Sequence, residues 1–335
     1  MSPRVLITIV TRNCAAYLRA CLESLRAQSC RDFLVCVWDN ASTDETLEII
    51  AADGAFIHNT DFSAANLGFC AGQNRLISSV DSEYVLVLNP DVVLQPRFIE
   101  ILVNALDQDP KAGAASGKLW RWQDTQRPAE PRILDTTGIY FTPSQRHFDR
   151  GSGELDRGQY ERREYVFGAS GAAAFYRRKM LEETKAGGEY FDEAFFTYRE
   201  DADLAWRAQW MGWRCLYVPE AAGFHVRLVL PERRASLPPL LNMHSFKNRF
   251  LLRTKNMDAG TYLRFLLPIT ARDLAAFAYV LARERTSLRA LPLLFRAFPG
   301  AWEVRKALQR HRRVSPKDMR TWFSYKPVTR PIRSR

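Results

Sequence analysis

The chain has 335 residues, of which 47% are hydrophobic and 12% aromatic, and its formal net charge is +11. This composition excludes a disordered or low-complexity protein and predicts one large domain with an appendage, or two domains. The charge is uneven, because residues 226–335 hold 24 Lys and Arg against 6 Asp and Glu, whereas residues 1–225 hold 24 against 31. The basic segment predicts an anionic partner, either nucleic acid or a phospholipid surface.

Short β-branched runs alternate with helical patterns along the first part of the chain. We expect strands at residues 5–10, 33–38, 55–58 and 84–88, and helices at 17–27, 42–52 (with Ser42 or Thr43 as its cap), 70–79 and 96–107. Buried strands separated by helices predict a doubly wound, mostly parallel α/β sheet flanked by helices. Ligands of such sheets bind at the carboxyl ends of the strands.

The later part of the chain changes character twice. Residues 121–163 are polar and rich in Arg, Pro and Gly, which predicts a long acceptor-side loop. Structure resumes at Val166, with helices near Arg178 and at 200–212 and a strand at 215–218. From about Arg227 the segments become basic and amphipathic. We therefore expect an α/β domain over residues 1–226 and a basic, amphipathic helical extension over 227–335.

The cysteines and the apolar segments bear on location. The six cysteines form no Cys-x-x-Cys pair, which predicts a reducing compartment without disulfides. A strand pattern begins at Val5 without a charged-then-apolar leader, so we expect no signal peptide. The longest apolar stretch, residues 265–282, contains Arg272 and Asp273 and does not qualify as a membrane span. With the basic extension, these features predict a cytoplasmic protein, peripheral at the inner face of the cytoplasmic membrane.

Polar residues follow the first two strands. Thr11, Arg12 and Asn13 end the first strand, and Asp39 ends the second. Together they would form a cleft for a nucleoside, in which the Asp39 carboxylate accepts the imide N–H of uracil or thymine. Asp39 would equally well shape a turn and cap the next helix, and the residues alone leave both interpretations open.

A glycine-containing segment opens the next predicted helix. Glycines let the backbone approach a pyrophosphate closely, and a helix N-terminus favours anions. The residues concerned are Asn66, Gly68, Gly72 and Asn74. The pattern is neither the dinucleotide fingerprint nor a P-loop, and an ordinary turn with glycines would also explain it.

The third strong strand ends in Asn89-Pro90-Asp91. A carboxylate at the mouth of a central strand would hold Mg²⁺ or Mn²⁺, which neutralises charge on a departing nucleoside diphosphate. Asn-Pro-Asp is also good turn chemistry, but the buried strand before it favours a metal site. His225 is a second candidate ligand, although a lone histidine is more often structural.

Three carboxylates, those of Glu200, Asp201 and Asp203, begin a later predicted helix. Acidic side chains at a helix N-terminus are stabilised by the helix dipole, and Asp203 is spaced to pair with Arg207. The functional alternative is a general base that takes the proton of an attacking hydroxyl. Because adjacent helical residues point to different faces, Glu200 and Asp201 need not both face the cleft.

Taken in order, these motifs resemble the family 2 glycosyltransferases, and specifically their rhamnosyltransferase-like branch, over roughly residues 4–255. The matching segments read TRN, DNASTD, NLGFCAGQN, LNPD, FGASGAAAFYRR and FDEAFFTYREDADLAWRAQWMGWRCLYVPEAAGFH. The resemblance implies the GT-A fold of nucleotide-diphospho-sugar transferases. It also implies a hexosyltransferase that works by a single in-line displacement with inversion, assisted by Mg²⁺ or Mn²⁺.

The resemblance also assigns residues. It implies that the nucleoside is held by Thr11, Arg12, Asn13 and Asp39, and that the donor diphosphate and sugar are lined by Asn66, Gly68, Gly72 and Asn74. The metal-binding D-x-D position would be occupied by Asn89 and Asp91, with His225 completing the metal shell. The general base would be Asp201, beside Glu200. The first carboxylate of D-x-D is missing here, a substitution that the branch commonly shows. The Q-x-x-R-W signature of processive synthases is absent, which favours addition of a single sugar.

The branch further implies dTDP-L-rhamnose as donor and a glycan or lipid-linked glycan as acceptor. The tail resembles the basic extension of enzymes that act on lipid-linked glycans. Its apolar side chains would enter an anionic membrane surface while Arg and Lys contact the headgroups. The alternative is that its helices pack on the catalytic domain.

A nucleotidyltransferase is the first rival function, although the loop from Thr11 to Cys14 lacks glycine. A nucleic-acid-binding protein is the second, but no recognised module appears and we expect no nucleic-acid partner.

Overall fold

The computed structural model describes residues 2–122, 131–227 and 238–324. Its centre is a ten-stranded sheet of order β10-β12-β6-β11-β4-β1-β2-β3, with β5 paired to β12 and β7 to β6. Its strands are β1 (Val5–Thr11), β2 (Phe33–Asp39), β3 (Asn59–Phe62), β4 (Tyr84–Leu88), β5 (Val92–Leu94), β6 (Ala112–Arg121), β7 (Leu134–Thr136), β10 (Glu164–Val166), β11 (Ala173–Arg177) and β12 (Arg214–His225). A separate hairpin consists of β8 (Ile139–Phe141) and β9 (His147–Asp149).

The sheet is mixed, with a parallel part formed by β1 to β4. β3, β2, β1 and β4 run parallel, β12 runs parallel to β6, and β11 lies antiparallel between β4 and β6. Strand residues alternate between two cores: Ile7 and Ile9 belong to one, while Leu6 packs with Trp38 on the other. Burial on both faces explains why β1 reads as a continuous apolar run.

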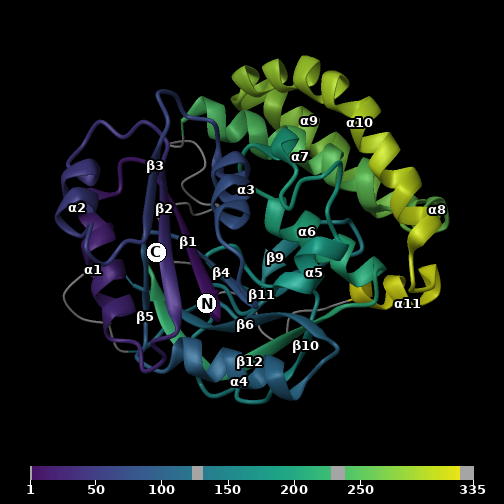
Figure 1. The fold of residues 1–335 in the computed structure, drawn as a ribbon. Coiled ribbons are helices and arrows are strands. Elements are labelled where there is room, and N and C mark those ends of the chain that lie inside the picture. Colours follow the sequence, from purple (N-terminus) through teal and green to yellow (C-terminus); the bar gives the residue numbers. More distant parts are fainter. Residues whose placement is uncertain (1, 123–130, 228–237, 325–335) are drawn as a thin grey trace.

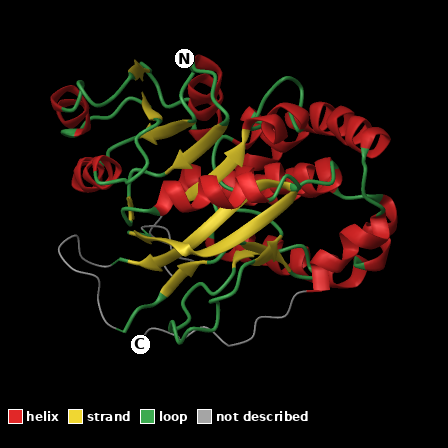
Figure 2. Cartoon of the chain, turned by 60° about the horizontal axis from the view of Figure 1, so that its bottom comes forward, coloured by secondary structure: helices red, strands yellow, loops and turns green. Residues whose placement is uncertain are grey.

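Helices cover both faces of the sheet (Figures 1 and 2). The helices of the α/β part are α1 (Ala15–Arg26), α2 (Thr46–Ala52), α3 (Phe69–Ser79), α4 (Phe98–Gln108), α5 (Arg178–Glu183) and α6 (Glu200–Trp210), with a 3₁₀ turn at Glu193–Phe195. Side chains of α1 and α4 fill one core, and those of α5 and α6 the other. The predicted α/β architecture is therefore confirmed.

Several predicted elements have different bounds. The helix expected from Ser42 begins at Thr46, because Ser42 bonds back to Asp39 and Asp44 accepts the Thr46 N–H at 3.1 Å. The strand expected at 55–58 is wrong and lies at Asn59–Phe62. The region 121–163 contains β7, β8 and β9 rather than a bare loop, although 123–130 lie outside the described residues. The strand expected to end at Val218 continues to His225 past an irregularity before Ala222.

The C-terminal extension is helical in its described part. It contains α7 (Pro239–Asn256), α8 (Ala259–Arg264), α9 (Leu266–Arg283), α10 (Ala290–His311) and α11 (Pro316–Thr321), with 3₁₀ turns at Arg285–Arg289 and Trp322–Ser324. α7 and α10 pack against each other, and the group lies over the α6 side of the sheet (Figure 1). Within the described residues, no helix is long and apolar enough to cross a membrane.

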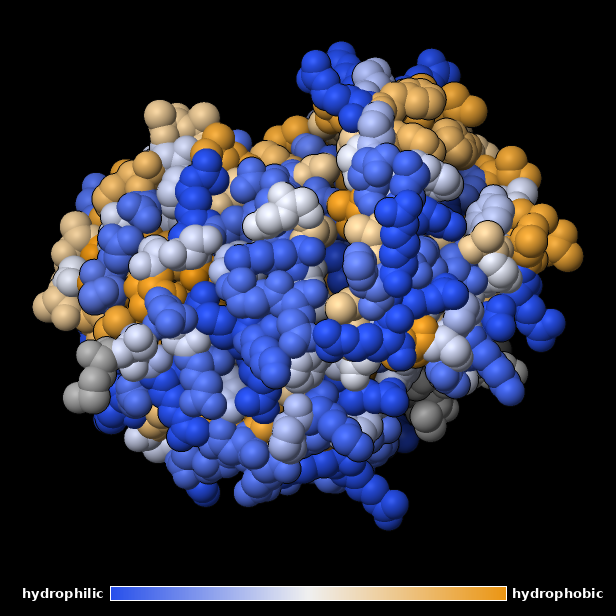
Figure 3. All heavy atoms as spheres, turned by 45° about the vertical axis from the view of Figure 1, so that its right-hand side comes forward, coloured by the Kyte–Doolittle hydropathy of each residue, from blue (hydrophilic) through white to orange (hydrophobic). Residues whose placement is uncertain are grey.

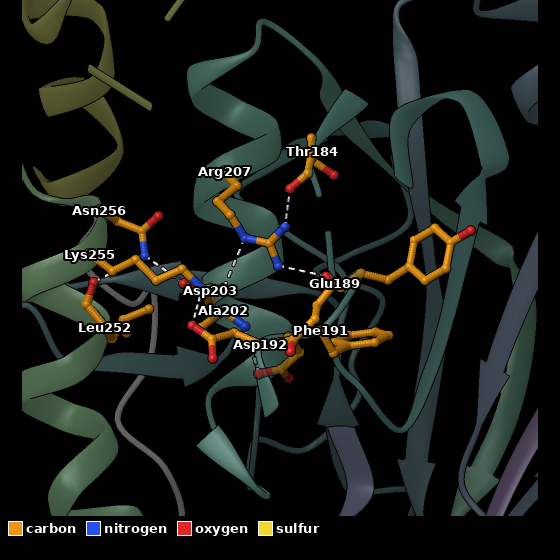
Figure 4. A network of polar contacts seen from close by, with 12 residues as sticks. Thr184, Glu189, Phe191, Asp192, Ala202, Asp203, Arg207, Leu252, Lys255 and Asn256 are labelled. Carbon is orange, nitrogen blue, oxygen red and sulfur yellow. Dashed lines mark hydrogen bonds and ion pairs between the residues drawn. The ribbon is translucent and has the colours of Figure 1, made fainter. Parts of the chain in front are cut away.

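A buried polar network joins α7 to α6 (Figure 4). The Asp203 carboxylate, which is fully buried, accepts hydrogen bonds from Arg207 at 2.9 Å, Lys255 at 2.8 Å and Asn256 at 2.7 Å. Burial opposes ionisation, but Lys255 and Arg207 hold the pKa of Asp203 below its usual range. The predicted pairing of Asp203 with Arg207 is confirmed, and removing one partner of such a buried set is strongly destabilising. α7 is thus anchored to the α/β part by buried charge.

Candidate active site

The ends of β1 and β2 meet at Asp39, whose side chain is almost fully buried. Its Oδ2 accepts hydrogen bonds from the hydroxyls of Thr11 at 2.9 Å and Ser42 at 2.5 Å, and its Oδ1 accepts the Ser42 N–H at 2.8 Å. A carboxylate has about four acceptor positions, so three protein donors leave one for the imide N–H of a base. The turn-shaping and nucleoside-binding interpretations of Asp39 are therefore compatible.

Arg12 and Asn13 lie exposed at the same strand end. Asn13 adopts a φ of 50° and bridges to the second loop, since its N–H donates to the Ser42 hydroxyl at 2.9 Å and its side-chain oxygen accepts the Thr43 N–H at 2.8 Å. The loops after β1 and β2 are thereby held together, with the Arg12 side chain directed to solvent.

Asn40, which follows Asp39 in the predicted polar cluster, is a positioning residue whose contacts the sequence did not indicate. Its side-chain oxygen accepts the indole N–H of Trp38 at 3.0 Å and the N–H of Leu67 at 3.1 Å, and its amide donates to the carbonyl of Gly68 at 3.0 Å. These bonds bring the predicted diphosphate segment to the end of β2. In the sequence, Asn40 was indistinguishable from an ordinary turn residue.

The residues expected to line the donor diphosphate each have a structural role in the fold. Asn66 accepts the Gly68 N–H at 3.0 Å, and Gly68 has a φ of 90° with no room for a Cβ, which would lie 2.6 Å from the Phe196 ring. A Cβ at Gly72 would lie 2.8 Å from Trp38, so this glycine lets α3 pack on the sheet. The Asn74 amide bonds both the N–H and the carbonyl of Phe191, at 2.9 and 2.7 Å. Donor contacts by these residues remain a prediction.

Asp91 and His225 lie together at the end of the central sheet, where β5 pairs with β12. Asp91 Oδ1 is 3.4 Å from His225 Nε2 and is buried with no hydrogen-bond partner among the described residues. Asn89, next to them, is held by its N–H, which donates to the Ala172 carbonyl at 2.9 Å. The structure therefore brings the predicted metal residues together.

Asp135 supports this pair and was not foreseen. Its Oδ2 lies 2.7 Å from His225 Nδ1, so it orients the imidazole and leaves Nε2 facing Asp91. Burial lowers the pKa of His225, but the charges of Asp135 and Asp91 raise it to about 10. Asp135 lies in the predicted loop 121–163, where no pattern of spacing singles it out.

The residues present fit a divalent cation only in part. Asp91 Oδ1 and His225 Nε2 face each other at 3.4 Å and would supply two coordination positions once a cation displaces the Nε2 proton. Hard cations take the remainder from phosphate oxygens and water. In the described ranges, no group of three or more His, Cys, Asp or Glu side chains gathers to hold an ion. The chain alone would therefore supply an incomplete shell that a diphosphate completes.

The Asp201 carboxylate lies half-buried at the start of α6. It accepts the N–H of Gly171 at 3.0 Å and that of Ala202 at 2.7 Å. Burial raises the pKa of Asp201 to about 6, against the opposing hydrogen bond from Gly171 and with some help from the charge of Asp149. A carboxylate with this pKa is ionised at neutral pH yet basic enough to accept a proton.

Glu200 differs from its neighbour. Its side chain is buried, its Oε2 has no hydrogen-bond partner among the described residues, and burial together with the Asp201 charge raises its pKa to about 8. Burial and the Asp201 charge thus favour the neutral form of Glu200, which leaves Asp201 as the candidate base.

The loop before α6 is held in an unusual backbone conformation. Phe196, Tyr198 and Arg199 have φ angles of 67°, 68° and 73°, which non-glycine residues rarely adopt. Asn248 of α7 compensates, because its amide donates to the carbonyls of Phe195, Thr197 and Tyr198 at 2.8 Å each. Strain of this kind persists where surrounding structure imposes it, commonly at functional sites. Sequence reasoning missed Asn248.

The metal-ligand pair and the base belong to one connected region. One link is the turn at 170–172. The N–H of Gly171 donates to the Asp201 carboxylate, and the carbonyl of Ala172 accepts the N–H of Asn89 at the end of β4. The other is a chain of ion pairs from His225 through Asp135 and Arg227 to Asp149, whose charge acts on Asp201. The candidate metal ligands and the candidate base are thus joined through this turn and through these ion pairs.

The sheet order, the flanking helices and the polar strand ends correspond to the GT-A fold of nucleotide-diphospho-sugar transferases. Two solved structures support the fold: S. aureus TarS 1–349 in complex with UDP-GlcNAc (TM-score 0.56, 15% identity, 92% of this chain and 90% of that one) and GalNAc-T7 with UDP, GalNAc and Mn²⁺ (TM-score 0.56, 12% identity, 76% of this chain and 48% of that one). At these identities the likeness concerns the fold alone.

Residues 6–185, more than half of the chain, match glycosyl transferase family 2, and the chain belongs to that family. It is similar to the N-acetylglucosaminyl-diphospho-decaprenol L-rhamnosyltransferase of Mycobacterium tuberculosis, with 29% identity over 249 residues that cover 65% of this chain and 75% of that protein. It also matches chondroitin synthase of Escherichia coli, with 32% identity over 32% of this chain and 16% of the synthase. The protein is a glycosyltransferase, which decides against the nucleotidyltransferase alternative.

Proposed function

We propose that the protein is an inverting rhamnosyltransferase that moves L-rhamnose from dTDP-L-rhamnose to a hydroxyl of a lipid-linked glycan. The observation that carries the reaction type is the position of the Asp201 carboxylate. It accepts a hydrogen bond from the N–H of Gly171, and the next residue, Ala172, accepts the N–H of Asn89 at the end of β4. The choice of sugar and acceptor rests on the mycobacterial relative, whose name specifies both.

In this proposal Asp201 takes the proton of the acceptor hydroxyl as that oxygen attacks the anomeric carbon from the side opposite the diphosphate. The two backbone N–H groups that fix its oxygens keep one carboxylate edge directed at the acceptor. Asp39 and its neighbours hold the nucleoside in place at the far end of the donor. A proton is transferred to Asp201, and the sugar–phosphate bond breaks as the new glycosidic bond forms.

Asp91 and His225 would hold Mg²⁺ or Mn²⁺ in this scheme, and such an ion would stabilise negative charge on the leaving diphosphate. Asp135 orients His225. Asn89 takes the place of a first carboxylate, so this region carries less negative charge than a full D-x-D motif and relies more on the ligand to complete the shell.

The exposed face of the C-terminal helices supports docking on an anionic membrane, as part of the same proposal. Leu267 on α9 and Phe295 on α10 are 82% and 74% exposed, far above the usual exposure of such side chains. Apolar side chains gather among hydrophilic ones on this side of the molecule (Figure 3). The exposed apolar residues of α8 to α10 are Tyr262, Leu263, Leu266, Leu267, Leu274, Tyr279, Leu281, Phe295, Phe298 and Trp302. Apolar and basic side chains combined favour a membrane interface at the cytoplasmic side.

The decisive experiment offers the purified protein a panel of nucleotide sugars, including dTDP-L-rhamnose, UDP-GlcNAc and GDP-mannose, with a short-chain GlcNAc-diphospho-lipid and Mn²⁺. Transfer only from dTDP-L-rhamnose, with an inverted anomeric configuration by NMR, supports the proposal. Efficient transfer of another sugar would refute the donor assignment, and a retained configuration would refute the single displacement.

A further inference from the structure

Arginine side chains from several elements gather around His147, at the start of β9. Arg199, just before α6, places its guanidinium 3.0 Å from His147 Nδ1, and Arg272 of α9 donates to the Ser144 carbonyl at 3.3 Å. Burial, reinforced by the charges of Arg199, Arg272 and Arg146, lowers the pKa of His147 well below its usual value. The histidine is therefore neutral, and the positive charge of the cluster is carried by the arginines.

Two arginines of the cluster have no carboxylate partner among the residues that the structure describes. Neighbouring Arg227 and Arg253 are paired with aspartates. By contrast, no carboxylate of the described residues lies within ion-pair distance of Arg146 or Arg272. Burial and three nearby guanidinium groups lower the pKa of Arg272 to about 9, against the opposing charge of Asp273. Arg272 is partly buried and Arg146 is exposed within Coulombic reach of it, so the two like charges repel. An anion bound between them would relieve that repulsion.

A second observation falls on the same turn. Gln145, directly before Arg146, is 1% exposed, has a φ of 58°, and neither polar atom of its side chain has a hydrogen-bond partner within the described part of the chain. Buried polar groups are nearly always satisfied, and non-glycine residues seldom adopt this backbone conformation. This strained turn, with its unsatisfied side chain, adjoins two guanidinium groups that no described carboxylate pairs, and such a combination is typical of a place that a polar ligand completes.

The position of the cluster assigns the anion to the acceptor rather than the donor. The donor diphosphate belongs beside Asp91 and His225, at the ends of β4 and β12. The arginines lie instead on the Asp201 side. Arg199 is two residues before Asp201 in the sequence. Asp149, two residues after His147, raises the pKa of Asp201 through its charge. A hydroxyl that Asp201 deprotonates must sit on this side.

Helix α9 connects the cluster to the apolar surface. Arg272 reaches inward to Ser144, while Leu267, Leu274 and Leu281 recur every seven residues and are 82%, 66% and 54% exposed. Residues seven apart lie on the same side of a helix. One helix therefore presents a guanidinium group to the cluster and an apolar stripe to the surroundings.

We propose that Arg146 and Arg272 form a subsite for the diphosphate of a lipid-linked acceptor, whose lipid chain lies along α9 and whose terminal sugar reaches Asp201. This inference rests on the proposed function and specifies its substrate class. Guanidinium groups bind phosphate oxygens through paired, charge-assisted hydrogen bonds, and two of them match the two charged groups of a diphosphate.

The test measures binding of geranyl diphosphate by calorimetry, without metal and with the donor site blocked by a saturating nucleoside diphosphate. Inorganic pyrophosphate and phosphatidylglycerol vesicles serve as comparison probes. We expect geranyl diphosphate to bind more tightly than pyrophosphate, and Arg146→Gln and Arg272→Gln each to weaken it about tenfold. Arg296→Gln, which removes the same charge from an exposed position on α10, should have no effect.

Unchanged geranyl diphosphate binding by both variants would overturn the proposal, as would an equal loss in Arg296→Gln, which would indicate a diffuse charge effect. Pyrophosphate binding as tight as geranyl diphosphate would disprove the lipid link. A loss confined to the vesicles would identify a membrane headgroup instead. Binding of the nucleoside diphosphate and the unfolding midpoint report whether each variant is folded. Because no transfer is measured, a wrong donor assignment would not produce any of these results.

Discussion

The backbone N–H of Gly171 donates a hydrogen bond to the Asp201 carboxylate at 3.0 Å. The next residue, Ala172, accepts the N–H of Asn89 at 2.9 Å, so one turn holds both the candidate base and the strand end that carries the metal-ligand candidate Asp91. The two groups that the proposed mechanism places on opposite sides of the same sugar are thereby held by one turn. Catalysis by positioning depends on this kind of constraint.

Asp201→Asn should abolish most of the activity while donor binding persists. The amide keeps the size of the side chain but accepts no proton at neutral pH, and general-base catalysis contributes roughly 100- to 10,000-fold. Steady-state kinetics would show the loss in kcat, with the donor Kd measured by calorimetry. Glu200→Gln is the matched control: the glutamate is already neutral at pH 7, so its variant should retain activity of the same order. Near-normal turnover by Asp201→Asn would show that another group is the base.

The pH dependence of the reaction should report the Asp201 carboxylate. Its pKa is raised to about 6, mainly by burial, and the base is active only when ionised. As the pH falls through 6, log kcat/KM should therefore decrease with a slope of one, whereas a solvent-exposed carboxylate would keep its activity down to about pH 4. An acidic limb centred near pH 4 would contradict the proposed environment of Asp201.

Glu200→Gln should stabilise the fold increasingly as the pH rises. The folded state keeps the Glu200 proton up to a pKa of about 8, above the ordinary value of a glutamate, so the folded protein binds more protons than the unfolded chain between these values. The stability of the parent protein relative to the variant should fall from about pH 4.5 to about pH 8 and then level off. Urea unfolding at several pH values measures the difference. A parent that gains stability relative to the variant over this interval would show that the sign is wrong.

Asp91→Asn should remove the effect of Mn²⁺ on nucleotide binding. In the parent protein Mn²⁺ and dTDP together should raise the unfolding midpoint more than dTDP alone, because a ligand that binds only the folded state stabilises it. Asp135→Asn leaves both candidate ligands in place but loosens His225, and loss of such a support typically weakens metal affinity about 10- to 100-fold. Titration of Mn²⁺ at fixed dTDP measures both. Unaltered Mn²⁺ affinity in Asp91→Asn would place the ion elsewhere.

The first 120 residues were largely predictable, because strands buried on both faces produce apolar runs such as β1 and β4 that few other structures explain. The candidate base and metal ligands were found through the motifs at the strand and helix ends. Asp135 and β7 to β9 were not, since short strands in a polar segment leave no periodic pattern. The predicted strand at 215–218 stopped too early because Pro219 follows it, and a proline usually marks a strand end. In the structure the register shifts after Val218 and β12 continues to His225.

Asn248 was missed for another reason: a single asparagine in an amphipathic helix is indistinguishable in sequence from a solvent-facing residue. It is fully buried, and it supports the 195–198 carbonyls from a helix beyond the matched family segment. Tertiary contacts of this kind join parts of the chain that are distant in sequence, and propensity and periodicity carry no information about them.

Asn248→Ser should therefore reduce kcat more than it reduces stability. The shorter hydroxyl cannot serve three carbonyls, so the strained backbone at Phe196, Tyr198 and Arg199 should relax and move Asp201 away from the acceptor. We expect kcat to fall by about tenfold or more, since small displacements of a positioned group are costly, with little change in the donor KM. The acidic limb of the pH profile should shift as the surroundings of Asp201 change.

Phe246→Leu is the matched control, because this buried residue of α7 packs with Val280 and Ala290 in a different cluster. It should lower the unfolding midpoint through lost packing while leaving the kcat of the folded enzyme and its pH profile unchanged. If Asn248→Ser behaves like Phe246→Leu, with lower stability but normal kcat and pH profile, Asn248 serves the fold alone. A selective loss of kcat would instead show that α7 sets the geometry of the general base, and that the first helix of the extension belongs functionally to the catalytic unit.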